Sequence, residues 1–135
     1  MSKIHNVSDY PAGATPLVAS SGAVGAAVAA ATLTPDADKQ AFLSGFEITG
    51  AGATTALPVS VTVTGIAGGT LTYSYTAIAG VLLANTPLIV QFAPPIPASA
   101  INTAIVVSCP SLGAGNTKNT CNAHGYQLKD RKSVV

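Results

Sequence analysis

Two cysteines and one histidine near the C-terminal end are the side chains best suited to chemistry in this sequence. Cys109, Cys121 and His124 could supply two thiolates and an imidazole, which are ligands that zinc prefers. A structural zinc site needs four such ligands, however, and an extended strand would point Cys121 and His124 to opposite faces. Cysteine is also common in cores as a small apolar residue. We therefore predict no metal site and no other cofactor.

The same two cysteines could instead form a disulfide. If residues 103–109 and 117–127 form a hairpin centred near Gly115, Cys109 and Cys121 become cross-strand neighbours with Cβ atoms about 4.5–5.5 Å apart. Cytosolic thiols are normally reduced, and two cysteines are too few for a disulfide scaffold. The sequence therefore leaves two alternatives open for this pair, a cross-strand disulfide or two reduced thiols.

Acids and bases that could catalyse a reaction are scarce. Glu47 is the only acid within the strand-like part of the chain, whereas a glycosidase would need a second carboxylate beside it. Asp36 and Asp38 lie in a turn, where aspartate is common for structural reasons. His5 lies close to the N-terminus, and Ser44 lacks the flanking glycines of a nucleophile elbow. We therefore predict that the protein is not an enzyme.

Charge is almost absent from the middle of the chain. Only 8% of the 135 residues are charged, against about 25% in a typical soluble domain, and none occurs from Ile48 to Thr117. The hydrophobic fraction of 48% is too high for a disordered chain. The net charge is +1, and three of the six basic residues are Lys129, Arg131 and Lys132. A basic stripe is therefore missing, and we expect no nucleic-acid partner.

Glycine, proline and asparagine divide the chain into apolar segments, with turns roughly every 8 to 15 residues. This pattern predicts a single all-β domain at residues 17–128, a β-sandwich or jelly roll of about eight antiparallel strands. Alanine also favours helix, so a helix is the alternative for the alanine-rich segment. The proline-rich stretch after residue 92 is expected to be a stiff connector. The expected strands are 17–20, 23–33, 41–49, the hairpin 59–76, 87–92, 103–109 and 120–128.

Alternation assigns faces to the third expected strand. Phe42, Phe46 and Ile48 share one face in a strand with a period of two, and Leu43 and Glu47 share the other. The first set is mainly aromatic and apolar. We therefore expect Phe42, Phe46 and Ile48 to lie together on one face of this strand.

The hairpin 59–76 alternates apolar residues with serine and threonine, so one of its faces carries hydroxyl groups and no charge. Charged side chains keep protein surfaces apart, and interface cores are depleted in lysine, glutamate and aspartate. We therefore expect other copies of the chain to cover this face. Tyr73 and Tyr75 belong to the same hairpin, either as core residues or as exposed stacking platforms for a partner.

Residues 1–16 are polar and predict an N-terminal arm, and residues 129–135 form a charged tail. Ile4, Val7 and Tyr10 recur every three residues along the arm and are candidates for binding a partner surface. The N-terminus does not look like a signal peptide. The alanine-rich segment is shorter than the about 20 residues of a membrane-spanning helix. We therefore expect a protein made in the cytoplasm with no membrane partner.

The phrases FLSGFEITGAGATT, VSVTVTGIAGGTLTYSY and PLIVQFAPPIPASAINTAIVVSCPSLGAGNTKNTCNAHGYQL resemble small virion proteins of tailed bacteriophages. The resemblance covers roughly residues 17–128 and includes no site motif. It implies a jelly roll that decorates or cements the capsid surface as a homo-oligomer, most simply a trimer. The major capsid protein would then be the partner and the virion the location.

The same resemblance allows a second role within the virion. The chain could be a tail or fibre component, or a β-sandwich module that binds a receptor glycan. In that hypothesis Tyr73 and Tyr75 would stack against the glycan.

Overall fold

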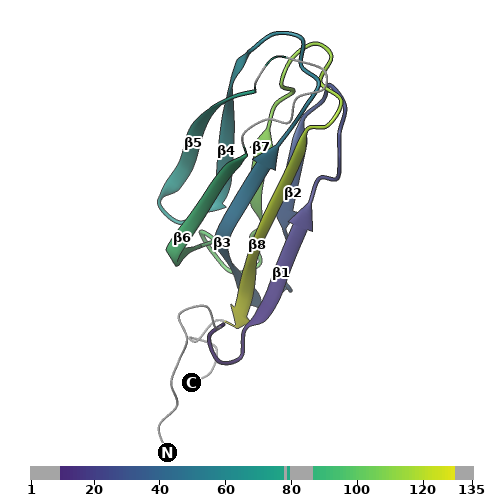
Figure 1. The fold of residues 1–135 in the computed structure, drawn as a ribbon. Coiled ribbons are helices and arrows are strands. Elements are labelled where there is room, and N and C mark those ends of the chain that lie inside the picture. Colours follow the sequence, from purple (N-terminus) through teal and green to yellow (C-terminus); the bar gives the residue numbers. More distant parts are fainter. Residues whose placement is uncertain (1–9, 78, 80–86, 130–135) are drawn as a thin grey trace, which may run out of the picture.

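The computed structural model describes residues 10–77, 79 and 87–129. This part of the chain contains eight strands and no helix, as Figure 1 shows. The all-β fold predicted from the turn pattern is confirmed. The strands are β1 (Thr15–Ser20), β2 (Ala29–Leu33), β3 (Lys39–Thr49), β4 (Pro58–Ile66), β5 (Gly69–Thr76), β6 (Leu88–Pro97), β7 (Ile105–Cys109) and β8 (Thr120–Lys129).

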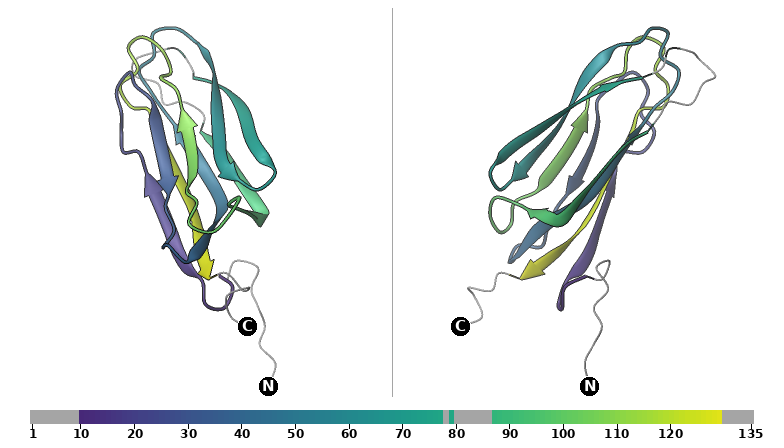
Figure 2. Two further views of the ribbon diagram at one scale, coloured as in Figure 1. Left: turned by 180° about the vertical axis from the view of Figure 1, so that it is seen from behind. Right: turned by 60° about the vertical axis from the view of Figure 1, so that its left-hand side comes forward.

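The strands form two antiparallel four-stranded sheets that face each other (Figures 1 and 2). Sheet A has the strand order β1-β8-β3-β6, and sheet B has the order β2-β7-β4-β5. The predicted β-sandwich is therefore confirmed. Only β4 and β5 are neighbours both in sequence and in a sheet, so all other strand pairs join distant parts of the chain.

The core lies between the sheets and is built from alternate residues of the strands. In β2, Ala29, Ala31 and Leu33 are buried, whereas Ala30 and Thr32 are exposed. This period of two is that of a strand. The helix alternative for the alanine-rich segment is therefore wrong, and the strand occupies only its C-terminal half.

The β4–β5 hairpin pairs as its sequence predicts. Val61 lies opposite Tyr73, and Val59 lies opposite Tyr75. Tyr75 is buried in the core, and Tyr73 is half-buried and packs against the core. The ring centroid of Tyr73 lies 5.4 Å from that of Phe46. Both tyrosines thus face the core side of sheet B. The hypothesis that they are exposed stacking platforms is wrong, and the core alternative holds.

The hairpin expected between residues 103–109 and 117–127 is wrong. Strand β7 lies in sheet B and β8 lies in sheet A, so the two segments never pair. Cys109 and Cys121 reach the core from opposite sheets and are both free, buried thiols. Burial raises the pKa of the Cys109 thiol to about 11 and that of Cys121 to about 12. The cross-strand disulfide is therefore wrong, and the alternative of two reduced thiols holds.

Buried asparagines hold the connection that carries the chain from β7 to β8. The side-chain amide of Asn119 donates to the carbonyl oxygens of Ala27 and Pro110, at 3.1 and 3.0 Å. The amide of Asn116 donates to the carbonyl oxygen of Ala51 at 3.0 Å. These bonds satisfy loop carbonyls that would otherwise be buried without partners. They fix a crossing between the sheets where the sequence pattern suggests a simple turn.

Strand β6 continues through the proline-rich stretch that was expected to be a connector. Ile96 and Pro97 pair with Leu43 and Phe42 of β3. Strand β6 is an edge strand of sheet A, which is where a strand tolerates proline because the outer edge needs no N–H donor.

The described part of the predicted arm is tied to the sandwich. A turn joins Pro11 to Ala14, whose N–H donates to the Pro11 carbonyl oxygen at 3.0 Å, with Gly13 at a φ of 83°. Strand β1 then begins at Thr15, two residues before the predicted domain boundary. Ile4 and Val7 lie outside the described residues, as do positions 130–135 of the predicted tail.

Candidate binding groove

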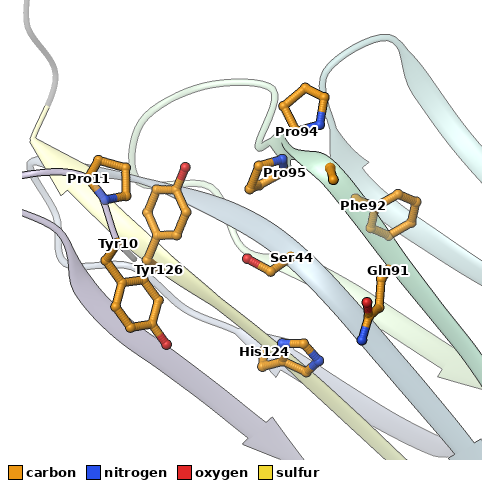
Figure 3. A pocket seen from close by; sticks show the side chains of 10 residues that line it. Tyr10, Pro11, Ser44, Gln91, Phe92, Pro94, Pro95, His124 and Tyr126 are labelled. Carbon is orange, nitrogen blue, oxygen red and sulfur yellow. The ribbon is translucent and has the colours of Figure 1, made fainter. Parts of the chain in front are cut away.

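A groove of about 570 Å³ lies on the outer face of sheet A. Figure 3 shows two walls, with Tyr10 and Tyr126 on one side and the proline-rich end of β6 on the other. Side chains from β3 and β8 form the floor between these walls. The lining residues are Tyr10, Pro11, Ser44, Gln91, Phe92, Ala93, Pro94, Pro95, His124 and Tyr126.

An irregularity in β3 creates the floor. The pairing register of β3 with both of its neighbours shifts between Leu43 and Gly45, as in a β-bulge. Leu43 is therefore buried before the bulge and Phe46 after it, although a regular strand would point them to opposite faces. The expectation that Phe42 shares a face with Phe46 is wrong. Phe42 and Ser44 instead contribute to the outer face of sheet A.

Two aromatic rings, those of Tyr10 and Tyr126, form the first wall, and the ring of Phe42 packs against it. The ring of Tyr126 stacks on that of Phe42, with centroids 4.9 Å apart and an interplanar angle of 16°. Tyr10 meets Tyr126 edge to face at 5.9 Å and 76°, which is a favourable geometry for aromatic pairs. The turn at Pro11 brings Tyr10 to this position. Burial raises the pKa of the Tyr126 phenol.

His124 and Glu47 are bonded to each other beside the floor and form an ion pair when the imidazole is protonated. The Nε2 atom of His124 lies 2.9 Å from Oε2 of Glu47, and the two side chains are 39% and 32% exposed. Gly45 makes this contact possible. A Cβ atom at Gly45 would lie 2.6 Å from the Val90 carbonyl oxygen and 3.1 Å from Cε1 of His124. Only glycine lets the imidazole lie against β3 and reach the carboxylate.

Two exposed apolar side chains flank the ion pair. Val18 on β1 pairs with His124 and is 78% exposed, and Ile89 on β6 pairs with Glu47 and is 58% exposed. The outer face of sheet A thus presents apolar groups around a small polar centre. This composition is typical of ligand pockets, in which a few polar groups orient the ligand.

The other predicted site residues lie elsewhere or do not cluster. Cys121 faces the core and His124 faces outward, so the prediction that they lie on opposite faces is confirmed. Among the described residues, no group of three or more His, Cys, Asp or Glu is placed to hold a metal ion. Asp36 pairs with Lys39 at 3.4 Å in a turn, and His5 lies outside the described residues.

Ser44, His124 and Glu47 have the residue types of a nucleophilic triad, but they are not arranged as one. Within the described chain, His124 bonds to Glu47 and no hydrogen bond joins it to Ser44. A nucleophile must lie within hydrogen-bond reach of its base for activation. In this geometry His124 is oriented by Glu47 and is not bonded to the Ser44 hydroxyl.

The sequence pattern did not predict the aromatic wall or the pairing of Glu47 with His124. Both depend on β8 lying next to β3, which the order of strands along the chain does not reveal. The bulge did leave a signal, because an isolated glycine inside a strand pattern is typical of a bulge, and Gly45 is such a residue.

Comparison with known proteins gives no further assignment. No protein-family model matches the chain, and no curated protein matches its sequence. No helix in the described ranges is long and apolar enough to cross a membrane. The function must therefore be argued from the surfaces of the sandwich.

Proposed function

We propose that this chain is a non-enzymatic structural protein of a tailed-bacteriophage virion, most simply a head decoration protein that binds the capsid as a homo-oligomer. The proposal starts from the resemblance in sequence. Its main structural support is the outer face of sheet B, whose strands carry no charged side chains.

The outer face of sheet B carries mainly hydroxyl groups. These hydroxyls align across the strands, since Thr62 pairs with Thr72 and Ser108, and Ser60 pairs with Ser74. No strand of sheet B contains an acidic or basic residue, so nothing on these strands repels another protein surface. The outward residues are Ala30, Thr32, Ser60, Thr62, Thr64, Thr70, Thr72, Ser74, Thr76, Val106 and Ser108.

The edge of sheet B at β5 also supports assembly. Natural edge strands are usually protected by proline, charge, a bulge or short length. Strand β6 has prolines, β1 contains Pro16, and β2 is only five residues long. Strand β5 has eight residues and contains neither proline nor a charged residue, and its register shift with β4 is confined to the turn end of the hairpin. A strand of a neighbouring copy could extend sheet B there by main-chain hydrogen bonds.

The strand order supports the jelly-roll part of the proposal. The first strand lies beside the last in sheet A, and consecutive strands change sheets everywhere except at the β4–β5 hairpin. Long connections of this kind are what two Greek keys require. The trimeric state comes from the resemblance alone.

Substitution on the two sheets tests the assembly. We expect Thr72→Lys, which adds a charge to the outer face of β5, to dissociate the oligomer and to abolish binding to purified particles. Thr49→Lys makes the same change at an exposed end of β3 in sheet A and serves as the matched control. Light scattering and co-sedimentation give the readouts, with the melting temperature showing that both variants fold. A wild-type protein that is strictly monomeric and absent from purified particles would remove the proposal.

The arm gives a second test of particle binding. Deleting residues 1–16 would remove part of β1 and the Tyr10–Tyr126 contact, so the informative truncation is of residues 1–9. We expect this truncation to keep the melting temperature and to weaken co-sedimentation with capsids severely, because repeated arms in an oligomer act through avidity. Full-strength binding by the truncated protein would show that the arm is not the attachment segment.

A tail or fibre component that binds a glycan is the second candidate function. Tyr73 and Tyr75 face the core and so are not exposed for stacking on a glycan. The groove on sheet A favours this function because it presents two other tyrosines, Tyr10 and Tyr126. Mass spectrometry of separated heads and tails distinguishes the two locations.

A further inference from the structure

We infer that the groove on the outer face of sheet A binds a short neutral saccharide. The inference gives the second candidate function a site and a ligand class, and it does not depend on where in a virion the chain is placed. It rests on the aromatic wall, on the unused hydrogen-bonding groups of the floor and on the charge of the lining.

The walls suit the apolar faces of a sugar ring. A pyranose has C–H groups on its faces and hydroxyl groups around its rim, so it packs its faces on apolar surfaces. Tyr10 is 50% exposed and is fixed in place by its contact with Tyr126. Pro94 and Pro95 provide a rigid apolar surface on the opposite side, as Figure 3 shows. A ring or a short chain of rings could lie between these walls.

The lining of the groove offers hydrogen-bonding groups that the described part of the protein does not use. In the described structure, the Ser44 hydroxyl and the Gln91 amide make no hydrogen bond to other residues, although both line the groove. An amide and a hydroxyl each donate and accept, as sugar hydroxyls do. The bond between His124 and Glu47 fixes the imidazole and leaves its Nδ1 atom for a ligand. These groups match the rim of a sugar.

The charge of the lining selects against anions. No lysine or arginine is among the described residues that line the groove, and the carboxylate of Glu47 lies beside it, bonded to His124. A phosphate or a sialic acid would meet this carboxylate with no described lysine or arginine in the lining to compensate. The volume of about 570 Å³ falls within the range of about 300–1,000 Å³ that is usual for small-ligand sites. A neutral oligosaccharide of a few rings is therefore the ligand class that fits best.

Titration with defined sugars tests the inference. Backbone amide shifts of the full chain would be followed by NMR during addition of maltotriose, cellotriose or N,N′,N″-triacetylchitotriose, with 3′-sialyllactose as the anionic probe and a proline-rich decapeptide as the peptide probe. We expect at least one neutral trisaccharide to bind with micromolar to millimolar affinity and to shift amides of β3, β6 and β8. Sialyllactose and the peptide should bind more weakly.

Variants connect the binding to the groove. Tyr10→Ala and Gln91→Ala should each weaken binding of that trisaccharide about ten-fold or more, which is about 1.4 kcal/mol. Tyr10→Phe should retain binding, because it keeps the ring. Ile101→Ala removes an exposed apolar side chain that does not line the groove and is the matched control. The inference is overturned if none of the neutral probes binds, if Tyr10→Ala binds like the wild type, or if the peptide or sialyllactose binds more tightly.

Discussion

The outer faces of the two sheets differ, although the sheets have the same number of strands and share one core. The outer face of sheet B carries mainly hydroxyl groups and no charge, and the register shift between β4 and β5 lies near their turn, between Val63 and Ile66. Sheet A has a bulge, an aromatic wall and an ion pair, with Val18 and Ile89 exposed beside that pair. Irregular backbone is retained where a side chain must be re-aimed, and bulges are over-represented near functional sites. This difference is the basis on which we propose assembly through sheet B and ligand binding on sheet A.

Among the substitutions that test this difference, we expect Gly125→Ala to have the largest effect on stability. A Cβ atom there would collide with the carbonyl group of Phe42 and would lie 3.2 Å from the Cα of Leu43. Both contacts are with backbone at the bulge, so neither can relax by a change of rotamer. We expect Gly125→Ala to lower the free energy of unfolding by about 3 kcal/mol or more, as overpacking can do.

Urea denaturation measures this effect, and Gly25→Ala is the control. At Gly25 the nearest atoms to an added Cβ would be 3.7 Å away, which is ordinary contact. The control should change the unfolding free energy by less than about 0.5 kcal/mol. A loss below about 1 kcal/mol for Gly125→Ala would show that the backbone at the bulge in sheet A can relax, and therefore does not hold the groove residues rigidly in place.

The two buried thiols in the core between the sheets provide a second test, with an effect on stability of intermediate size. Burial raises the pKa of Cys109, on sheet B, to about 11 and that of Cys121, on sheet A, to about 12, against an ordinary value of 9. Because the folded-state pKa values are raised, the neutral thiols contribute stability that is fully present below pH 9. That stability is lost as the pH rises through the folded values.

We therefore expect the wild type to lose on the order of 1–2 kcal/mol per thiol between pH 8 and pH 10.5, on the rule that one pKa unit is about 1.4 kcal/mol. The variant Cys109→Ala/Cys121→Ala should show a shallower alkaline decline, although it is less stable at pH 8. Urea denaturation at both pH values gives the comparison. Equal slopes would mean that the two sheets do not enclose these thiols in a dry core.

The regular parts of the molecule were predictable from sequence, and the irregular parts were not. The β4–β5 hairpin is local, and its alternation and its glycine turn determine both its pairing and its faces. Sheet order is not local, so the neighbours of β7 and β8 had to come from the structure. The expectation of a hairpin between them failed for this reason.

The groove shows the same limit. Glu47 and His124 were recognised as the titratable residues of the strand region, and His124 was correctly separated from Cys121. Their pairing depends on the bulge at Gly45, which shifts the alternation of β3 part-way along the strand. A strict period of two therefore assigned Phe42 to the wrong face. The stacking of Phe42 on Tyr126 could not be predicted once Phe42 was placed on the same face as Phe46.

The smallest expected effect concerns the ion pair on sheet A. His124 and Glu47 are about a third exposed, and ion pairs at such positions typically contribute about 0.2–1 kcal/mol. A double-mutant cycle of Glu47→Gln and His124→Gln at pH 7 should therefore give a coupling energy below about 1 kcal/mol. The Thr62→Val and Thr72→Val cycle on sheet B is the matched cross-strand control and should give a similarly small value. If the ion pair couples by about 2 kcal/mol or more, it is a structural element of sheet A. A small coupling means that the bond to Glu47 orients the His124 imidazole beside the groove without being needed to hold sheet A together.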